Sequence, residues 1–548
     1  LYNSKDEAID LSGWFLSKGI DFTFPAGTMI GSGEYLVVTE DASLRTESPT
    51  TSVAAKYGTN PTLIYGPFVG GLNNDGESIE LHDATGLKID GVDYGHGFPW
   101  PTVGDGPSGD GSGHSMQLVH AGLDNDLGGS WRSASPTPGA ANVGVLVSNL
   151  PPQIRQVQHT PKQPTATDAV TVTAKITDVD LVTSVNLLYQ IVAPGNYVRI
   201  NDAAYNNWIS VPMNDTGAAG DLVAGDSIFS AQLPASTRSH RNLIRYRVRA
   251  TDGASQSITV PYSDDPQPNF ALFVYDGVPA WSGANNGGAA TSFSSDVMGS
   301  MRPYHLIARP IDVTNCQYNS SFGNTRFKGT LVYDGEVYEH IEFKIRGQGS
   351  TYLSGKNKWK FFFNRGHEFE VRDDYGKKYA EPWRVMSLSA CATPYNANHR
   401  GSSGIDEALG FRLFNLAGVP APRTHYFQLR VIDDAVEASP SSQYEGDLWG
   451  LYLATEFPDG RFLKEHDLPD GNTYKMEGSG DKKNQSATQS ISGSDLSSFR
   501  ASDTSGQSVA WWEANLDLEA YFAFRAVNQI ISNLDMSASR NYYWNHNS

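Results

Sequence analysis

Short segments in which apolar and polar residues alternate run through the first half of the chain, and glycine, proline and aspartate separate them. Alternation with a period of two places every second side chain on one face of a β-strand. Val170, Val172 and Ala174, for example, alternate with polar residues. The pattern predicts two consecutive β-sandwich domains, over residues 1–142 and 150–275.

The pattern changes in the second half of the chain. Residues 276–300 are rich in glycine, alanine and serine and have few large apolar side chains, which predicts a linker. From 301 to 548 predicted strands alternate with helices, which indicates an α+β domain. Two apolar stripes predict helices that are packed into its core, one with Leu409, Leu413 and Leu416 and the other with Leu518, Phe522, Ala526, Ile530 and Leu534.

Composition and charge narrow the functional classes. The chain has 548 residues and a net charge of −19, and an acidic protein of this kind repels the phosphates of nucleic acids. No stretch approaches the roughly 20 apolar residues that a membrane span needs. The two cysteines, Cys316 and Cys391, can form at most one disulfide. We therefore expect no nucleic-acid partner and no membrane span in this chain.

Basic residues lie on a predicted strand that follows a glycine-containing turn. Residues 343–363 are expected to form a strand, this turn and a second strand, and free N–H groups in such a turn can cradle phosphate. The second strand separates two sets of side chains, with Lys358, Lys360 and Phe362 on one face and Trp359, Phe361 and Phe363 on the other. A lysine in this position holds nucleotide phosphates in kinases. The alternative is an ordinary hairpin with solvated lysines.

Four further polar residues lie on or beside predicted strands. Glu456 ends a predicted buried strand, and Lys475 lies in the next one. Asp535 and Asn541 lie in the turn between the last helix and the last strand, and a carboxylate and an amide oxygen on one turn suit Mg²⁺. Taken singly, the first two could equally be surface charges, and the last two could be ordinary turn residues.

Three aspartates, Asp215, Asp221 and Asp226, are interspersed with glycines. Oxygen-rich turns of this type can bind Ca²⁺, which accepts flexible carboxylate and carbonyl ligands, although the spacing does not fit an EF-hand loop. A structural Ca²⁺ ion is one interpretation, and a set of solvated turns is the other.

The N-terminal segments resemble the lamin-tail domain, a small immunoglobulin-like sandwich. Three segments occur in the order of that family: 8–38, 72–101 and 130–142. Family members carry one more strand before the position of Leu1, so we expect the domain to be incomplete at its N-terminus. The domain over 150–275 resembles the immunoglobulin- or fibronectin-like spacers of exported bacterial proteins, which suggests an extracellular location.

The C-terminal region resembles the CotH kinase family, which is related to spore-coat kinases. The resemblance spans roughly 326–544, and its segments occur in the order of the family: RGQGS…KNKWKF, AGVPAPRTHYFQLRV, GLYLATEFPDGRFL, NTYKMEG and NLDMSASRNYYW. It implies a two-lobed, protein-kinase-like fold that uses ATP and Mg²⁺ and transfers phosphate to serine or threonine of a protein.

The resemblance also implies a role for each candidate residue. Asp535 is expected to be the catalytic aspartate, and Asn541 to contact a metal ion or phosphate. Lys360 is expected to be the nucleotide lysine, with Lys358 as its rival. Three more residues are expected to bind the cofactor. Arg346 and Lys475 are expected to lie along the phosphates, and Glu456 is expected to lie near the hinge strand, where the adenine binds.

Members of the CotH family continue after this turn with a second aspartate-rich segment that binds the metal. It is expected beyond Ser548, so we expect little or no kinase activity from this polypeptide. The sequence thus predicts a secreted kinase that phosphorylates a protein of the cell surface or matrix. The alternative is a non-catalytic adhesion or scaffold protein with a pseudokinase module. No pattern specifies the acceptor or the oligomeric state.

Overall fold

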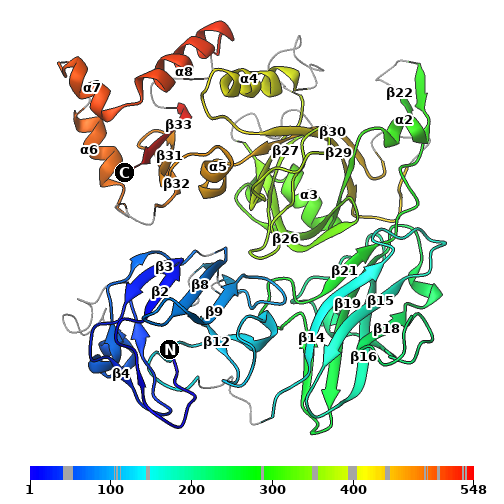
Figure 1. Ribbon diagram of the computed structural model, residues 1–548. Helices are drawn as coiled ribbons and strands as arrows, with labels where there is room; N and C mark the ends of the chain where they lie inside the picture. Colours follow the sequence, from blue (N-terminus) through cyan, green and yellow to red (C-terminus); the bar gives the residue numbers. More distant parts are fainter. Residues whose placement is uncertain are drawn as a thin grey trace. The chain divides into compact units, whose positions relative to one another are not determined.

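The computed structural model describes most of the chain (Figure 1). The described residues are 1–547 except for 41–52, 74, 104, 107–108, 111–112, 143–148, 285–288, 348–355, 393–403, 439–444, 487–488, 490–491, 503–505, 534–535 and 537–539. They form two compact units. The first contains residues 1–192, 202–276 and 364–367, and the second contains residues 193–201, 277–363 and 368–548.

The N-terminal part of the first unit is built on a five-stranded antiparallel sheet in the order β7-β3-β2-β8-β9. Its strands are β2 (Phe15–Lys18), β3 (Ile20–Thr23), β7 (Val69–Gly70), β8 (Glu77–His82) and β9 (Lys88–Tyr94). Shorter elements complete this part: β1 (Ile9–Asp10) pairs with β4 (Met29–Ile30), β5 (Val37–Val38) with β6 (Ile64–Tyr65), β10 (Asp105–Gly106) with β11 (Gly109–Asp110) and β12 (Ser115–Leu118) with β13 (Trp131–Ala134), and α1 spans Val53–Tyr57. Short strands separated by turns are what the sequence predicts here.

The remainder of the first unit contains two further sheets. One consists of β14 (Gln153–Thr160), β15 (Thr171–Thr177) and β18 (Ile228–Gln232); the other consists of β16 (Val182–Val192), β17 (Ile209–Pro212), β19 (Leu243–Asp252), β20 (Ser257–Val260) and β21 (Phe270–Phe273). Both sheets contribute side chains to one apolar core. Val172 and Ala174 are fully buried in it while their neighbours on β15 are not, which confirms the predicted alternation.

The second unit begins with elements in the segment that the sequence predicts to be a linker. Strands β22 (Trp281–Ala284) and β23 (Ala290–Phe293) form a hairpin, and α2 (Ser295–Gly299) follows it. The rings of Trp281 and Phe293 stack across the hairpin, with their centroids 6.0 Å apart. This cross-strand aromatic pair gives the segment a local structure that its glycine-rich composition does not indicate.

A closed barrel of seven strands forms the centre of the second unit, in the order β24-β25-β26-β27-β28-β30-β29 (Figure 1). The strands are β24 (Pro303–Ile307), β25 (Phe327–Tyr333), β26 (Glu336–Arg346), β27 (Lys358–Phe362), β28 (Val385–Ser389), β29 (Thr424–Ile432) and β30 (Leu448–Glu456), and α3 (Pro310–Tyr318) lies between β24 and β25 in the chain. Parallel pairing of β24 with β29 closes the barrel.

Aromatic side chains fill the barrel, among them Tyr304, Phe343, Trp359, Phe361, Phe369, Phe427 and Tyr452. On β27, Trp359 and Phe361 are fully buried in this core, whereas Lys358 and Lys360 are only partly buried on the opposite face. The predicted division of this strand into an apolar and a basic face is therefore confirmed. Burying an aromatic ring stabilises the fold and also determines which way the neighbouring lysines point.

A smaller region of mixed structure follows the barrel in the chain. It contains the three-stranded sheet β32-β31-β33 and several helices, which are drawn beside the barrel in Figure 1. The strands are β31 (Gly471–Glu477), β32 (Asp481–Asn484) and β33 (Arg540–Asn547), and the helices are α5 (Gly460–Glu465), α6 (Ser494–Ser502), α7 (Val509–Asn515) and α8 (Leu518–Ile530). One face of the sheet packs with Leu496 of α6 in an apolar cluster: Tyr474, Met476, Leu496, Tyr542 and Trp544.

The prediction that two apolar stripes are buried is wrong for several of their members. On α8, Phe522 is 63% exposed and Ile530 is 77% exposed, and on α4 (Ile405–Leu416) Leu409 and Leu416 are also exposed. The helices instead contact each other through Phe414 and Phe524, whose rings stack with centroids 5.7 Å apart. Regular spacing predicts the helices, but the partner that covers a helix face is decided by the tertiary structure.

Cys316 and Cys391 are both free thiols, so the disulfide that the sequence allows is not formed. Among the described residues, no helix is both long enough and apolar enough to cross a bilayer.

A buried histidine inside the barrel predicts acid sensitivity. Burial, aided by the Arg302 guanidinium, lowers the pKa of His425 to about 3, and the ring bonds to the Tyr304 hydroxyl at 2.6 Å. Below pH 6.5 His425 becomes protonated in the unfolded chain, whereas in the folded chain it stays neutral down to about pH 3. The free energy of unfolding should therefore fall by roughly 1.4 kcal/mol for each unit by which the pH is lowered between these two values.

Urea unfolding of the wild type and of His425→Gln at pH 8.0 and pH 4.5 measures this effect. The substitution has its own cost at both values, so the quantity of interest is the change with pH. We expect that change to be smaller in the variant by roughly 2–3 kcal/mol. Equal pH dependence in the two proteins would contradict a neutral His425 in the core.

Candidate functional site

Two cross-strand pairs of basic residues occupy one face of the barrel wall. In the antiparallel pairing of β26 with β27, Lys344 lies opposite Lys360 and Arg346 lies opposite Lys358. Residues directly opposite each other share a face of the sheet, and like charges in such pairs destabilise it. Four positive charges are thus concentrated on one patch of a chain whose net charge is −19. An anion bound there would relieve their repulsion.

Lys360 is the most strongly perturbed member of this cationic face. Burial is the main cause that lowers its pKa to about 7, and the nearby charges of Lys483, Arg346, Lys344 and Arg326 add to the effect. Its ammonium group lies 3.9 Å from the ring centroid of Phe457, the residue that follows β30. An aromatic ring can hold a cation in place but cannot neutralise it. Among the described residues no carboxylate forms an ion pair with Lys360, so its ammonium group is positioned to attract an anion.

Polar side chains continue the face of Lys360 across the barrel. Lys360 lies opposite Ser387 on β28, and Ser387 lies opposite Thr455 on β30. Thr455 Oγ1 and Arg346 Nη1 are buried, and neither has a hydrogen-bond partner among the described residues. Buried polar groups without partners are costly, so such atoms on one face commonly mark a place where a polar ligand binds.

The sheet β32-β31-β33 presents a second set of charged side chains. Lys475 lies opposite both Asp481 and Tyr543, so these three residues share one face. Partial burial raises the pKa of Tyr543 to about 12, and the Arg346 guanidinium opposes the rise, which places Arg346 of the barrel close to this face. Lys483 of β32 likewise acts on Lys360. Charged side chains of the small sheet therefore lie close enough to the basic face of the barrel to influence its residues electrostatically.

Lys475, which the sequence predicts as a cofactor-binding residue, lies on this charged face. It forms an ion pair with Glu477, which is two residues away on the same strand. Of the predicted site residues, Arg346, Lys358, Lys360 and Lys475 all belong to the two charged faces. The structure thus brings together residues that are up to 129 positions apart (346 to 475) in the sequence.

Glu456 lies on the other side of the barrel wall from Lys360. It is opposite Met386 of the apolar core, whereas Thr455 shares the face of Lys360. Burial raises its pKa, and its carboxylate contacts His466 Nε2 at 3.0 Å and accepts a hydrogen bond from the Arg423 backbone at 2.9 Å. These contacts account for Glu456 as a structural group at the end of β30. Its role in cofactor binding stays a prediction.

The predicted catalytic turn is described only in part. Asn541 lies on β33 with a φ of 66°, a left-handed conformation that asparagine tolerates better than most residues, and its position is two residues before Tyr543. Asp535 lies outside the described residues, as do residues 348–355, which include part of the predicted glycine-containing turn. The roles of Asp535 and Asn541 therefore stay predictions.

Sequence reasoning missed several residues of this site, among them Lys344, Phe457, Lys483 and Tyr543. Lys344 could have been found, because it alternates with Arg346 on the first strand of the hairpin. Phe457, Lys483 and Tyr543 come from other strands, and only the packing of the small sheet beside the barrel brings them to the basic face.

The three aspartates of the glycine-rich turn also come together. Their carboxylate oxygens lie within 4.8 Å of one another: Asp215, Asp221 and Asp226. Backbone N–H groups already donate to all three of them, from Gly225 to Asp215 at 2.7 Å, from Gly217 to Asp221 at 2.6 Å and from Ile228 to Asp226 at 2.9 Å. The turn is therefore stable without an ion, and a bound Ca²⁺ stays a prediction.

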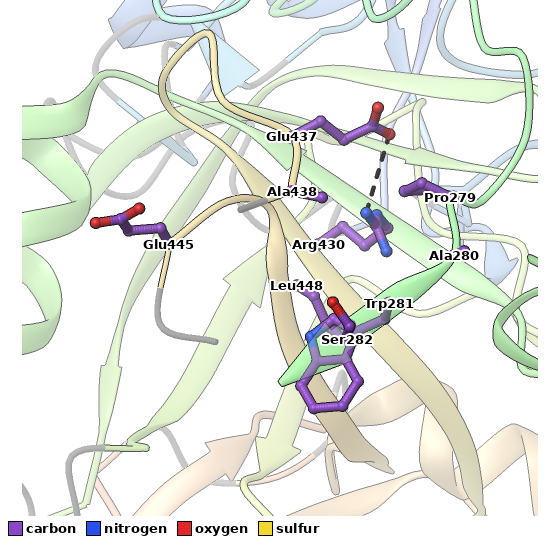
Figure 2. A pocket seen from close by; sticks show the side chains of 9 residues that line it. All are labelled: Pro279, Ala280, Trp281, Ser282, Arg430, Glu437, Ala438, Glu445 and Leu448. Atoms are coloured by element: carbon purple, nitrogen blue, oxygen red, sulfur yellow. Dashed lines mark ion pairs between the residues drawn. The ribbon is translucent and has the colours of Figure 1, made fainter. Parts of the chain in front are cut away.

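A separate pocket with a volume of about 120 Å³ lies where the hairpin β22–β23 meets β29 and β30 (Figure 2). The buried Arg430 points into it, and its guanidinium pairs with Glu437 at 3.9 Å. Trp281 and Leu448 line the same pocket. None of the residues predicted for the functional site lines it, so it is distinct from the cationic face.

Fold and site together define a multidomain, mostly β protein with a cationic face in a mixed α/β region. Comparison with protein families gives the more particular identification. Residues 343–548 match the family described as CotH kinase protein, and residues 1–96 match the Lamin Tail Domain. The chain therefore carries a CotH kinase family region and an N-terminal lamin tail domain, as the sequence predicts. No curated protein matches the chain.

Membership of this region in the CotH family suggests protein kinase activity and implies the use of ATP. The match begins at residue 343, on β26, and so includes all residues of β27 and of the small sheet. Every predicted site residue lies inside it. The barrel extends further towards the N-terminus, because β24 and β25 precede the matched residues.

Proposed function

We propose that the CotH region binds the phosphates of ATP between the two charged faces and transfers the terminal phosphoryl group to serine or threonine of a protein. The observation that carries the proposal is the register of β26 with β27, which places Lys344 opposite Lys360 and Arg346 opposite Lys358. A triphosphate carries the negative charge that these four basic residues attract. Donors preorganised around transferring phosphoryl groups are the main means of catalysis in kinases.

The residues of the site fit ATP chemically. Buried Arg346 Nη1 and Thr455 Oγ1 have no partner among the described residues, and phosphate oxygens accept hydrogen bonds from both groups. Lys360 and Lys358 would hold the phosphates from the barrel, and Lys475 from the small sheet. ATP, when bound, supplies the phosphoryl group, and Mg²⁺ would be held by oxygen ligands from Asn541 and Asp535.

Within this proposal, Asp535 orients the acceptor hydroxyl and accepts its proton, as the aspartate of a kinase catalytic loop does. The adenine would lie towards the end of β30, where Phe457 offers an aromatic ring. The ring of Phe457 lies beside Lys360, whereas Oε2 of Glu456 is bonded to His466 and to the Arg423 backbone on the other side of the barrel wall.

We further propose that the protein acts outside the cell on a surface or matrix protein. Support comes from the lamin tail domain, from the sandwich that follows it and from the acidic composition of the chain. A Ca²⁺ ion at Asp215, Asp221 and Asp226 would stiffen a turn of that sandwich. In this arrangement the β-domains hold the kinase region near its protein acceptor.

A second candidate function is a non-catalytic scaffold with a pseudokinase module. The exposed apolar residues Phe522 and Ile530 of α8 favour it, since exposed apolar surface often marks a protein-binding site. The two candidates differ in phosphoryl transfer. A scaffold would bind its partner through the helices without any transfer.

Thermal unfolding with ATP, with adenosine and without ligand tests the proposal. A ligand that binds only the folded protein at 100 times its Kd stabilises it by about 2.7 kcal/mol. We expect ATP with Mg²⁺ to raise the melting temperature and adenosine to raise it much less, because most of the contacts are to phosphate. No shift with ATP at millimolar concentration would contradict the proposal.

Incubation with γ-labelled ATP and a serine- and threonine-containing protein then separates the two candidate functions. Label that depends on Asp535, so that Asp535→Asn binds ATP but transfers nothing, supports the kinase. Because the sequence predicts little or no activity for residues 1–548 alone, the assay uses a chain that also carries the metal-binding segment expected beyond Ser548, and binding of ATP without any label in that chain would instead favour the scaffold.

A further inference from the structure

We propose that Lys483 of β32 binds the phosphates from the side opposite to Lys360. In the ligand-free protein Asp481 forms an ion pair with Lys483, and the phosphates displace Asp481 when they bind. The inference rests on the proposed binding of ATP to the cationic face. It assigns a binding residue that sequence reasoning did not single out and a carboxylate that competes with the ligand for it.

The position of Lys483 follows from the strands around it. Lys360 overlies the ring of Phe457, and α5 begins three residues later at Gly460. A Cβ atom on Gly460 would lie 2.9 Å from the side-chain oxygen of Asn484, so β32 passes directly beside the start of α5. Lys483 precedes Asn484 on this strand. Of all charged neighbours, it has the largest influence on Lys360.

The side chain of Lys483 belongs to the charged face of the small sheet. Asp481 lies opposite Lys475 and shares its face. Lys483 is the extra residue of a β-bulge between Lys482 and Asn484, and its ion pair with Asp481 places its ammonium group beside that face. Only 21% of the Lys483 side chain is exposed. A half-buried ammonium group that acts on another buried lysine is unfavourable by itself, so this arrangement needs a negative charge close by.

Asp481 supplies that charge in the structure. It forms an ion pair with Lys483, and its own side chain is 63% exposed. An ion pair with a solvent-exposed carboxylate contributes little to stability, so a triphosphate can replace Asp481 as the partner of Lys483. Release of Asp481 to solvent would accompany binding. The pair therefore keeps Lys483 near the cationic face without blocking it.

The neighbouring Lys482 provides a matched control. It lies opposite Tyr474 on the other face of the sheet, with its ammonium group 5.4 Å from the Tyr474 ring and 2.6 Å from Gln485 Oε1. Lys482→Met removes the same charge, one residue away, from the face that packs on α6. A general electrostatic effect of the β32 lysines would appear in both variants.

Isothermal titration of the full chain with ATP and with adenosine tests the proposal. Hydrogen bonds to charged groups contribute about 1.5–3 kcal/mol, so Lys483→Met should weaken ATP binding by about tenfold or more and leave adenosine binding unchanged. Lys482→Met should bind ATP like the wild type. Asp481→Asn should bind ATP about two to five times more tightly, and Asp481→Asn combined with Lys483→Met should match Lys483→Met alone.

The outcomes distinguish this inference from the proposed function. If Lys360→Met loses ATP binding while Lys483→Met binds like the wild type, Lys483 is no phosphate ligand and the proposed function stands. Equal losses in Lys482→Met and Lys483→Met would also overturn the inference. If the folded wild type, checked by circular dichroism, binds no ATP, both proposals fail together.

Discussion

Replacing Lys360 by methionine should weaken ATP binding by roughly 100-fold and at the same time raise the melting temperature of the ligand-free protein. Methionine fills a similar volume but cannot donate a charge-assisted hydrogen bond, which contributes up to about 3 kcal/mol. Burial and four cationic neighbours make the ammonium form of Lys360 unfavourable in the absence of ligand. Removing it relieves that cost. Titration calorimetry and thermal unfolding measure the two effects.

The pH dependence of binding gives a second readout of the same group. In the free protein the pKa of Lys360 is about 7, so the side chain is mostly neutral at pH 8.5. Bound phosphate would return the pKa towards 10.5, and binding would take up a proton. ATP affinity of the wild type should therefore fall by up to about tenfold per pH unit above pH 7. Lys360→Met should lack this component.

Lys328 offers the matched control for Lys360. It lies on the neighbouring strand β25, is 46% exposed and forms an ion pair with Glu342 at 3.1 Å. Lys328→Met should change ATP affinity by less than about threefold, because a solvated and paired charge contributes little. A similar loss in both variants would indicate that ATP responds only to net charge, which would contradict a specific site at Lys360.

Replacing Trp359 by alanine should destabilise the second unit by about 3–5 kcal/mol. The Trp359 side chain is fully buried, its ring lies 5.1 Å from that of Trp449, and its Nε1 donates to the Tyr452 hydroxyl at 3.3 Å. Alanine leaves a large cavity at the centre of the barrel and a buried hydroxyl without its donor. Few single changes in this chain should cost more.

Amide hydrogen exchange with mass spectrometry reports this loss for each unit separately, which a single melting curve of a multidomain protein does not. Exchange should accelerate in β27 and its neighbours and stay unchanged in β15 and β19 of the first unit. Trp281→Ala, on the partly exposed hairpin β22, serves as the control and should leave β27 protected. Unchanged protection of β27 in Trp359→Ala would contradict its central place in the core.

Trp359 and Lys360 are adjacent, yet their predicted effects have opposite signs on stability. Alternation along β27 points one side chain into the aromatic core and the other at the charged face. The core residues bury enough apolar surface to keep an unfavourable cluster of lysines in place. Stability lost at a binding site and regained in the adjacent core is a common trade-off in functional proteins.

The sequence alone was sufficient for features that depend on neighbours along the chain. Alternation within 358–363 determined which residues face the core, and the order of the C-terminal segments indicated the CotH family, which the family comparison confirms. The basic strand, with Lys358, Lys360 and the nearby Arg346, could be named for the same reason. Periodicity and local motifs carry this information because a strand has only two faces.

Other features were decided by tertiary structure. The apolar spacing of Phe522 and Ile530 predicts burial, but nothing among the described residues covers them. Glu456 and Thr455 face opposite ways by alternation, but only the register of β30 with β28 decides that Thr455, and not Glu456, shares the face of Lys360.

Lys483 shows the same limit most clearly. Nothing in the residues around it indicates a partner on a strand more than a hundred positions earlier, yet it is the strongest charged neighbour of Lys360. The sequence by itself determined the strands, their two faces and the family of this region. Only the tertiary structure decided which charged faces lie near each other, through the position of the small sheet beside the barrel. Contacts between distant segments depend on the whole fold, so they produce no periodic pattern along the chain.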